Sequence, residues 1–207
     1  LSIPKIFNVL FGAIVALSGM AGIYASAKIY LVPARPAWNT VRTPLRFFLT
    51  GFVLGPLFSL VVYSAYLLVT RSGGVFTEIR GPILLWLAIS STAALFQLLV
   101  LFARLFYLDE EKKPELYDSA LLLTRRFKAH FLTRIGLLVV GSFILPIGYL
   151  FYFVTAPQVS GAQIAAFSTI SFVLALLGEL LGRYLFFVTV VPKNMPGSFF
   201  TESGSGH

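Results

Sequence analysis

The sequence of 207 residues contains no cysteine, only two histidines and two methionines, and few charged residues. Without cysteine the chain has no disulfide, no thiolate zinc site and no cysteine-ligated iron–sulfur cluster of its own. Charged residues make up 12% of the chain, about half the share typical of a soluble domain, while 57% are hydrophobic. This composition, with a mean hydropathy of +0.87, predicts an integral membrane protein.

Five apolar runs are long enough to cross a bilayer, which needs about 20 residues per helix. They cover residues 7–32, 45–70, 82–108, 131–154 and 162–191. The runs are too long and too continuously apolar to be strands of a membrane barrel. We therefore predict an all-α fold, a polytopic transmembrane helix bundle with five spans in one domain over residues 1–201. Residues 202–207 resemble a linker that leads into a histidine tag.

The basic residues lie at the ends of these runs, so the net charge of +8 does not indicate nucleic-acid binding. Excess positive charge next to spans marks cytoplasmic loops. Cations gather in the connections after the first and third runs and follow the last run, whereas residues 155–161 carry no charge. This pattern predicts that both connections and the C-terminal segment are cytoplasmic and that the N-terminus is outside.

Segment 114–128 has a different pattern, because apolar residues alternate with charged ones. It is typical of an amphipathic helix that lies at the membrane interface. Its polar face is equally suited to dock a soluble partner. Two prolines inside the runs, Pro56 and Pro146, are expected to bend their helices. The pair Gly178 and Gly182 is a small-xxx-small spacing that allows close approach of a neighbouring helix.

Glu179 is the one acidic residue well inside any of the apolar runs, and Arg183 follows it four residues later. A charged side chain at the centre of a membrane helix costs about 2.5–3.5 kcal/mol on insertion scales. At a spacing of four residues the two side chains share one helix face. The pair is either a neutralised packing pair or part of a quinone site or proton path. A carboxylate at this depth can accept a proton that quinol oxidation releases.

Three further side chains are candidates for the same quinol site or proton path. Gln97 is a polar residue near the middle of the third run and is typical of either an interhelical hydrogen bond or a site. His130, at the start of the fourth run, is either an interfacial histidine or a proton relay, and Tyr184 directly follows Arg183. His130 and His207 are the only histidines, so the chain cannot hold a bis-histidine haem by itself. We predict no metal site and find no motif of a catalytic nucleophile or phosphate loop.

Two long stretches carry a family resemblance. Residues 27–39 (AKIYLVPARPAWN), followed by FFLT at 47–50 and LGPL at 54–57, form the first, and residues 178–187 (GELLGRYLFF) form the second. Both resemble the dimethyl sulfoxide reductase anchor subunit family. The resemblance maps the five runs to the last five of the eight helices in that family. In the family, the first three helices, to which none of the five runs corresponds, contribute residues to the quinol site, including a histidine.

The resemblance implies a function. The anchor would bind menaquinol, oxidise it without haem, and pass electrons to a partner. The partners would be a ferredoxin-like iron–sulfur subunit with four clusters and a molybdopterin catalytic subunit, which performs the terminal reduction. This implies a part of a respiratory oxidoreductase complex in the cytoplasmic membrane of a bacterium or archaeon, active in anaerobic respiration.

The connection after the first run is the candidate docking surface for the iron–sulfur subunit. Its candidate residues are Arg35, Trp38, Asn39 and Arg42, and its prolines make it semi-rigid. An alternative from another class is a small membrane transporter or a structural membrane-assembly protein, in which Glu179 and Arg183 bind substrate or only pack. A transporter of this kind often shows inverted repeats, and the first and last pairs of runs share only their apolarity.

Overall fold

The computed structural model describes residues 5–70, 80–103, 105–109, 114–155 and 160–193. Regular structure in these ranges is helical throughout, which confirms the predicted fold class. The elements are α1 (Lys5–Lys28), α2 (Arg42–Thr70), α3 (Arg80–Phe102), η1 (Leu105–Asp109), α4 (Pro114–Leu121), η2 (Leu122–Arg126), α5 (Lys128–Val139), η3 (Val140–Ile144), α6 (Leu145–Thr155) and α7 (Gly161–Val188). Five helices of the described chain, with α5 to α6 as one of them, are long and apolar enough to cross a membrane.

The first span ends earlier than the apolar run suggested. The run continues to residue 32, but α1 ends at Lys28. The N–H groups of Tyr30 and Leu31 bond to carbonyls three residues back, which tightens the chain into a turn. Pro33 and Pro36 follow, and a proline disfavours helical backbone in the residue before it. The third span also ends early, at Phe102, because η1 packs against α4 instead of continuing α3.

The segment predicted as one amphipathic helix over 114–128 contains two complete elements, α4 and η2, and the first residue of α5. Pro114 begins α4, where its missing N–H costs nothing, and α4 ends at Leu121. A π-helical turn, η2, then leads into α5. The apolar side of α4 packs on the bundle, with Leu116 and Ala120 buried. Ser119 Oγ accepts a 3.2 Å hydrogen bond from the backbone N–H of Val191, which ties α4 to the segment after α7.

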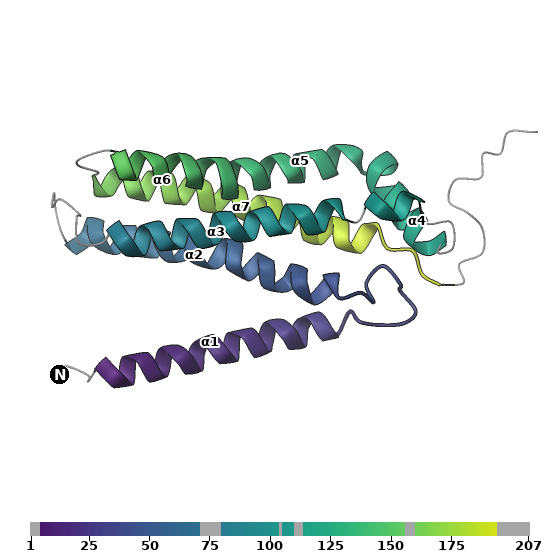
Figure 1. Ribbon diagram of the computed structural model, residues 1–207, viewed down its shortest axis with the longest axis horizontal. Helices are drawn as coiled ribbons and strands as arrows, with labels where there is room; N and C mark the ends of the chain where they lie inside the picture. The colour runs from purple at the N-terminus through teal and green to yellow at the C-terminus, as the bar shows by residue number, and fades with distance from the viewer. Residues whose placement is uncertain (1–4, 71–79, 104, 110–113, 156–159, 194–207) are drawn as a thin grey trace, which may run out of the picture.

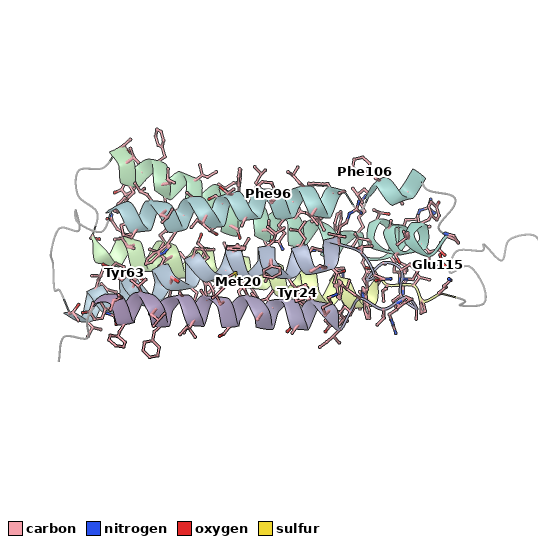
Figure 2. The ribbon with its side chains drawn as sticks, turned by 60° about the horizontal axis from the view of Figure 1, so that its bottom comes forward. Met20, Tyr24, Tyr63, Phe96, Phe106 and Glu115 are labelled. Atoms are coloured by element: carbon pink, nitrogen blue, oxygen red, sulfur yellow. The ribbon has the colours of Figure 1, made fainter. Side chains whose placement is uncertain are left out.

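Helices α2, α3, α5–α6 and α7 form the bundle, and α1 lies beside α2 (Figure 1). The α1–α2 connection, α4 and the end of α7 gather at one end of the long axis, here named the loop end. Figure 2 shows the labelled Glu115 of α4 at this end and Tyr63 of α2 at the opposite one. Near the loop end α1 lies close to α2: a Cβ added at Gly51 of α2 would lie 3.3 Å from the Ile23 side chain of α1.

Most of the buried apolar side chains form three clusters along the bundle. The far cluster contains Leu60, Leu67, Ile83, Leu87, Tyr149, Phe153 and Ile164. The middle cluster contains Leu49, Val53, Leu57, Ala93, Ala94, Leu138 and Ala175. The loop-end cluster contains Leu101, Leu123, Phe131 and Leu185. Each cluster draws on several helices, so the clusters hold the helices in one arrangement along their length.

Helix α5–α6 passes through a π-helical turn, η3, directly before Pro146. The N–H of Leu145 bonds to the carbonyl of Val140, five residues back, instead of to Gly141. Pro146 has no N–H to offer to Gly141. The carbonyl of Gly141 therefore lacks a donor from its own helix, and Ser171 Oγ of α7 donates a 2.6 Å hydrogen bond to it. The predicted irregularity at Pro146 is thus accommodated by a bond between helices.

Replacing Ser171 with alanine is expected to destabilise the bundle by about 1–3 kcal/mol, because the buried carbonyl of Gly141 then has no partner. Ser26→Ala is the matched control, since Ser26 is exposed and bonds only within its own helix. The control is expected to change stability by less than about 0.5 kcal/mol. Equilibrium unfolding in detergent micelles measures both variants, and equal effects would contradict the role given to Ser171.

Candidate functional site

A polar layer crosses the bundle between the middle and loop-end clusters. Gln97 on α3, Arg134 on α5 and Glu179 on α7 each lie, along their helix, between a member of one cluster and a member of the other. Their exposed fractions are 2%, 2% and 4%. Because apolar layers flank these groups on both sides, their polar atoms depend on partners within the protein.

Glu179 joins three helices through its carboxylate. Thr50 Oγ1 of α2 donates a 2.6 Å hydrogen bond to Glu179 Oε2. Gln97 Nε2 of α3 donates a 2.5 Å hydrogen bond to Glu179 Oε1. The three residues are distant in sequence, so the layer also fixes how α2, α3 and α7 are placed against one another. Both predicted residues of this group, Gln97 and Glu179, therefore lie together.

Arg134 occupies the space that Gly182 leaves open on α7. A Cβ on Gly182 would lie 2.5 Å from Arg134 Nε, 2.6 Å from Cζ and 2.8 Å from Nη2. Any side chain at this position would displace the guanidinium. The second glycine of the pair, Gly178, brings the same two helices together, since its Cβ would lie 3.3 Å from Leu137. The two glycines of α7 thus contact α5, and the space over Gly182, here named the slot, holds the Arg134 guanidinium.

Arg183 lies on the same side of the bundle as Glu179 but points elsewhere. Its Cζ lies 3.6 Å from the ring centroid of Phe47, a cation–π contact with α2. Thr50 and Gln97 donate to the Glu179 carboxylate, whereas the Arg183 guanidinium contacts the Phe47 ring. Arg134 and Arg183 both interact electrostatically with the carboxylate. Arg183 is therefore a charge close to Glu179 whose guanidinium lies over the Phe47 ring.

A small cavity of about 10 Å³ lies within this layer. Its lining residues are Arg46, Phe47, Thr50, Gln97, Arg134, Glu179, Gly182, Arg183 and Phe186. Three arginines and one carboxylate line the cavity, so its surroundings carry an excess of positive charge. A space of this size holds about one water-sized group. Among the described residues, no group of three or more histidines and carboxylates is placed to hold a metal ion.

His130 and Tyr184 lie on the outer face of the bundle, away from the cavity lining. Tyr184 is 45% exposed, and His130 is also exposed. Their ring centroids are 5.8 Å apart, and the ring of Phe127 contacts both. The structure therefore groups these two predicted residues with each other and separates them from Gln97 and Glu179.

The α1–α2 connection is fixed on the end of α7. Trp38 stacks on Phe186 with ring centroids 5.2 Å apart, and its Nε1 donates a 3.0 Å hydrogen bond to the Phe186 carbonyl. That carbonyl belongs to the last turn of α7, where helix acceptors lack partners of their own. The Arg35 guanidinium lies 4.6 Å from the Trp38 ring, and the side chain of Asn39 is exposed. The candidate docking loop is therefore held by the same helix that carries Glu179.

Arg42 begins α2 beneath this loop. It lines a second cavity of about 20 Å³ together with Arg46 and side chains from the loop and α4. Arg46 also lines the cavity beside Glu179. Basic side chains of α2 thus extend from the loop end to the polar layer.

Arg134 is one of the residues of this site that sequence reasoning missed. It lies near the start of the fourth apolar run, among cations that the charge pattern assigns to a loop. The glycine pair on α7 indicates a close helix contact, but it does not identify the side chain that fills the space. Thr50 was missed as well, although it lies inside one of the motifs that carry the family resemblance.

Comparison with known proteins gives one positive result. The family model of the DMSO reductase anchor subunit (DmsC) matches residues 1–188, which is most of the chain. Searches of curated proteins and of solved structures found no match. The five apolar helices agree with an anchor in the membrane. The chain therefore belongs to the DMSO reductase anchor subunit family and is a multi-pass membrane subunit of a DMSO reductase-type complex.

Proposed function

We propose that this subunit oxidises menaquinol in the cytoplasmic membrane of a bacterium or archaeon during anaerobic respiration. The electrons pass to an iron–sulfur subunit and from there to a molybdopterin subunit, which carries out the terminal reduction. Oxidation of a quinol to a quinone releases two protons and two electrons. The electrons leave through the partner, and the protons need an acceptor at membrane depth.

The observation that carries this proposal is the buried carboxylate of Glu179. It is buried in the polar layer and accepts hydrogen bonds from Thr50 and Gln97. Two neutral donors hold this carboxylate in place at membrane depth, which suits a group that accepts and releases protons. Nearby arginines offset the negative charge that the site carries when the proton leaves.

The position of the docking loop also supports the proposal. Trp38 packs on Phe186, and Phe186 lines the cavity that Glu179 lines. A partner docked on Arg35 and Asn39 would thus contact a loop that rests directly on the site. Electron transfer requires that the quinol and the first cluster lie close to each other. The contact of the loop with Phe186 supports a docking surface next to the proposed quinol site.

Purification in mild detergent through an affinity tag, with iron and molybdenum assayed on the eluate, tests the anchor role. We expect molybdenum in proportion to the chain and iron in several-fold excess over molybdenum. Asn39→Trp is expected to lower both metals, because it places a bulky ring on the exposed docking loop. Thr92→Trp, at an exposed position in the middle of α3, is the matched control and is expected to retain them.

The alternative of a small transporter or a structural assembly protein makes the opposite prediction. A folded preparation without either metal would contradict the proposed function and leave Glu179 and Arg134 as packing groups. Metals that remain unchanged in Asn39→Trp would contradict only the choice of docking loop.

A further inference from the structure

Two buried polar atoms of the site have no hydrogen-bond partner among the described residues. They are Gln97 Oε1, an acceptor, and Arg134 Nε, whose N–H is a donor. Both side chains line the cavity of about 10 Å³. A buried polar atom without a partner costs stability, so a pair of them around one cavity indicates that something binds there.

The orientation of the Gln97 amide follows from its neighbour. A carboxylate accepts hydrogen bonds, so the amide must direct its N–H groups to Glu179. The amide oxygen then points away from Glu179 and needs a donor. Arg134 is held in place independently, because its guanidinium fills the slot over Gly182. The acceptor and the donor are therefore both set by other contacts.

The chemistry of the two atoms selects the ligand. A group that satisfies both must donate one hydrogen bond and accept another, and a hydroxyl group does both. The cavity has room for about one oxygen atom with its hydrogens. We propose that Gln97 Oε1 and Arg134 Nε together bind a single hydroxyl oxygen, supplied by a quinol or by a water molecule.

A quinone carbonyl or an ether oxygen accepts hydrogen bonds but donates none. Either would leave Gln97 Oε1 unpaired, and a methyl ether would also exceed the space. If a quinol supplies the hydroxyl, the pair Gln97 Oε1 and Arg134 Nε distinguishes the reduced substrate from the oxidised product and favours release of the product. The quinol form of the inference rests on the proposed function, whereas the water form does not. In the quinol form the ring lies outside the cavity, and in both forms only one oxygen enters it.

The test uses the full chain, with its co-purified subunits, in lipid nanodiscs under anaerobic conditions. Calorimetric titration measures the Kd of a short-chain naphthoquinol, of its quinone and of its dimethyl ether. The wild type is expected to bind the quinol about tenfold or more tightly than the other two probes. This comparison needs no variant, so it remains valid if a substitution prevents folding.

Two variants and a control test whether Gln97 Oε1 and Arg134 Nε cause the preference for quinol. Arg134→Lys keeps the charge but removes the Nε donor, and Gly182→Ala displaces the guanidinium without touching Gln97. Both are expected to abolish the preference for quinol. Ser91→Ala is the control, because Ser91 is also buried on α3 with an unpartnered hydroxyl but does not line the cavity. It is expected to keep the preference.

Infrared spectra after exchange into deuterated water show whether a water molecule supplies the bound hydroxyl oxygen. An O–D band of a bound water would support water as the occupant of the site at Gln97 and Arg134. The band must be present in the wild type and in Ser91→Ala and lost in Arg134→Lys. If this band is found and the naphthoquinol does not bind, the proposed function is contradicted, but the hydroxyl site at Gln97 and Arg134 is supported with water as its occupant. Equal affinity for all three probes and no such band would overturn the inference.

Discussion

Replacing Glu179 with glutamine is expected to slow quinol oxidation by about 10²–10⁴-fold and to leave the complex assembled. Glutamine has the same shape as glutamate and keeps one carbonyl oxygen, to which Gln97 can still donate. Its NH2 group takes the place of the other oxygen and can donate to the Thr50 hydroxyl, which can also accept. The amide cannot take up the proton that the quinol releases. The rate of quinol oxidation, divided by the iron content of the same preparation, measures this effect separately from assembly.

Glu115→Gln is the matched control for this prediction. Glu115 lies on α4, outside the polar layer, so the same chemical change there is expected to leave the rate near that of the wild type. A wild-type rate in Glu179→Gln would show that this carboxylate is not the proton acceptor. A variant that loses its iron would point instead to a role of Glu179 in assembly.

Replacing Gly141 with alanine is expected to lower the stability of the bundle by about 1–3 kcal/mol. A Cβ at this position would lie 2.7 Å from the backbone nitrogen of Ala175 and 2.7 Å from Leu174 Cβ. Backbone atoms of α7 cannot move aside cheaply, so the two helices would have to separate. The movement would also disturb the hydrogen bond from Ser171 to the Gly141 carbonyl. Equilibrium unfolding in detergent micelles measures the loss.

Gly148→Ala is the control, because it lies on the continuation of the same helix and a Cβ there meets nothing within 4 Å. Alanine favours a helix over glycine by up to about 1 kcal/mol, so this variant is expected to be as stable as the wild type or slightly more stable. Equal destabilisation by the two substitutions would show that the close contact at Gly141 is unimportant.

Much of the fold follows from local properties of the chain. Each span is a run of apolar residues of membrane length, and in lipid such a run must satisfy its backbone hydrogen bonds within its own helix. The number of spans could therefore be predicted without knowledge of their packing. Glu179 was recognisable for a similar reason, because a single acidic residue in an apolar run is costly wherever its helix packs.

The ends of the helices were harder to predict than their existence. Hydropathy continues past Lys28 to the first proline, but the backbone turns earlier through three-residue hydrogen bonds. The end of α3 depends on η1 packing against α4, which is a contact between separate segments. Apolar character alone does not mark such points, because a turn at the membrane surface can also be apolar.

The partners of the buried charges were decided by the tertiary structure. A spacing of four residues places Glu179 and Arg183 on one helix face, yet Arg183 extends to Phe47. Arg134 instead fills the slot over Gly182, and Thr50 and Gln97 hold the carboxylate. Helical periodicity gives the direction of a side chain but not the neighbour it meets, and that neighbour comes from a helix far away in sequence.

The sequence by itself thus determined the membrane location, the five spans, the family and the buried carboxylate. Each of these depends on composition, on run length or on a continuous motif. Only the tertiary structure decided that Arg134 belongs to the site and that His130 and Tyr184 lie on its outer face. The reason is physical, because these assignments depend on how helices rotate and approach one another, and small residues such as Gly182 set that approach through atoms they lack.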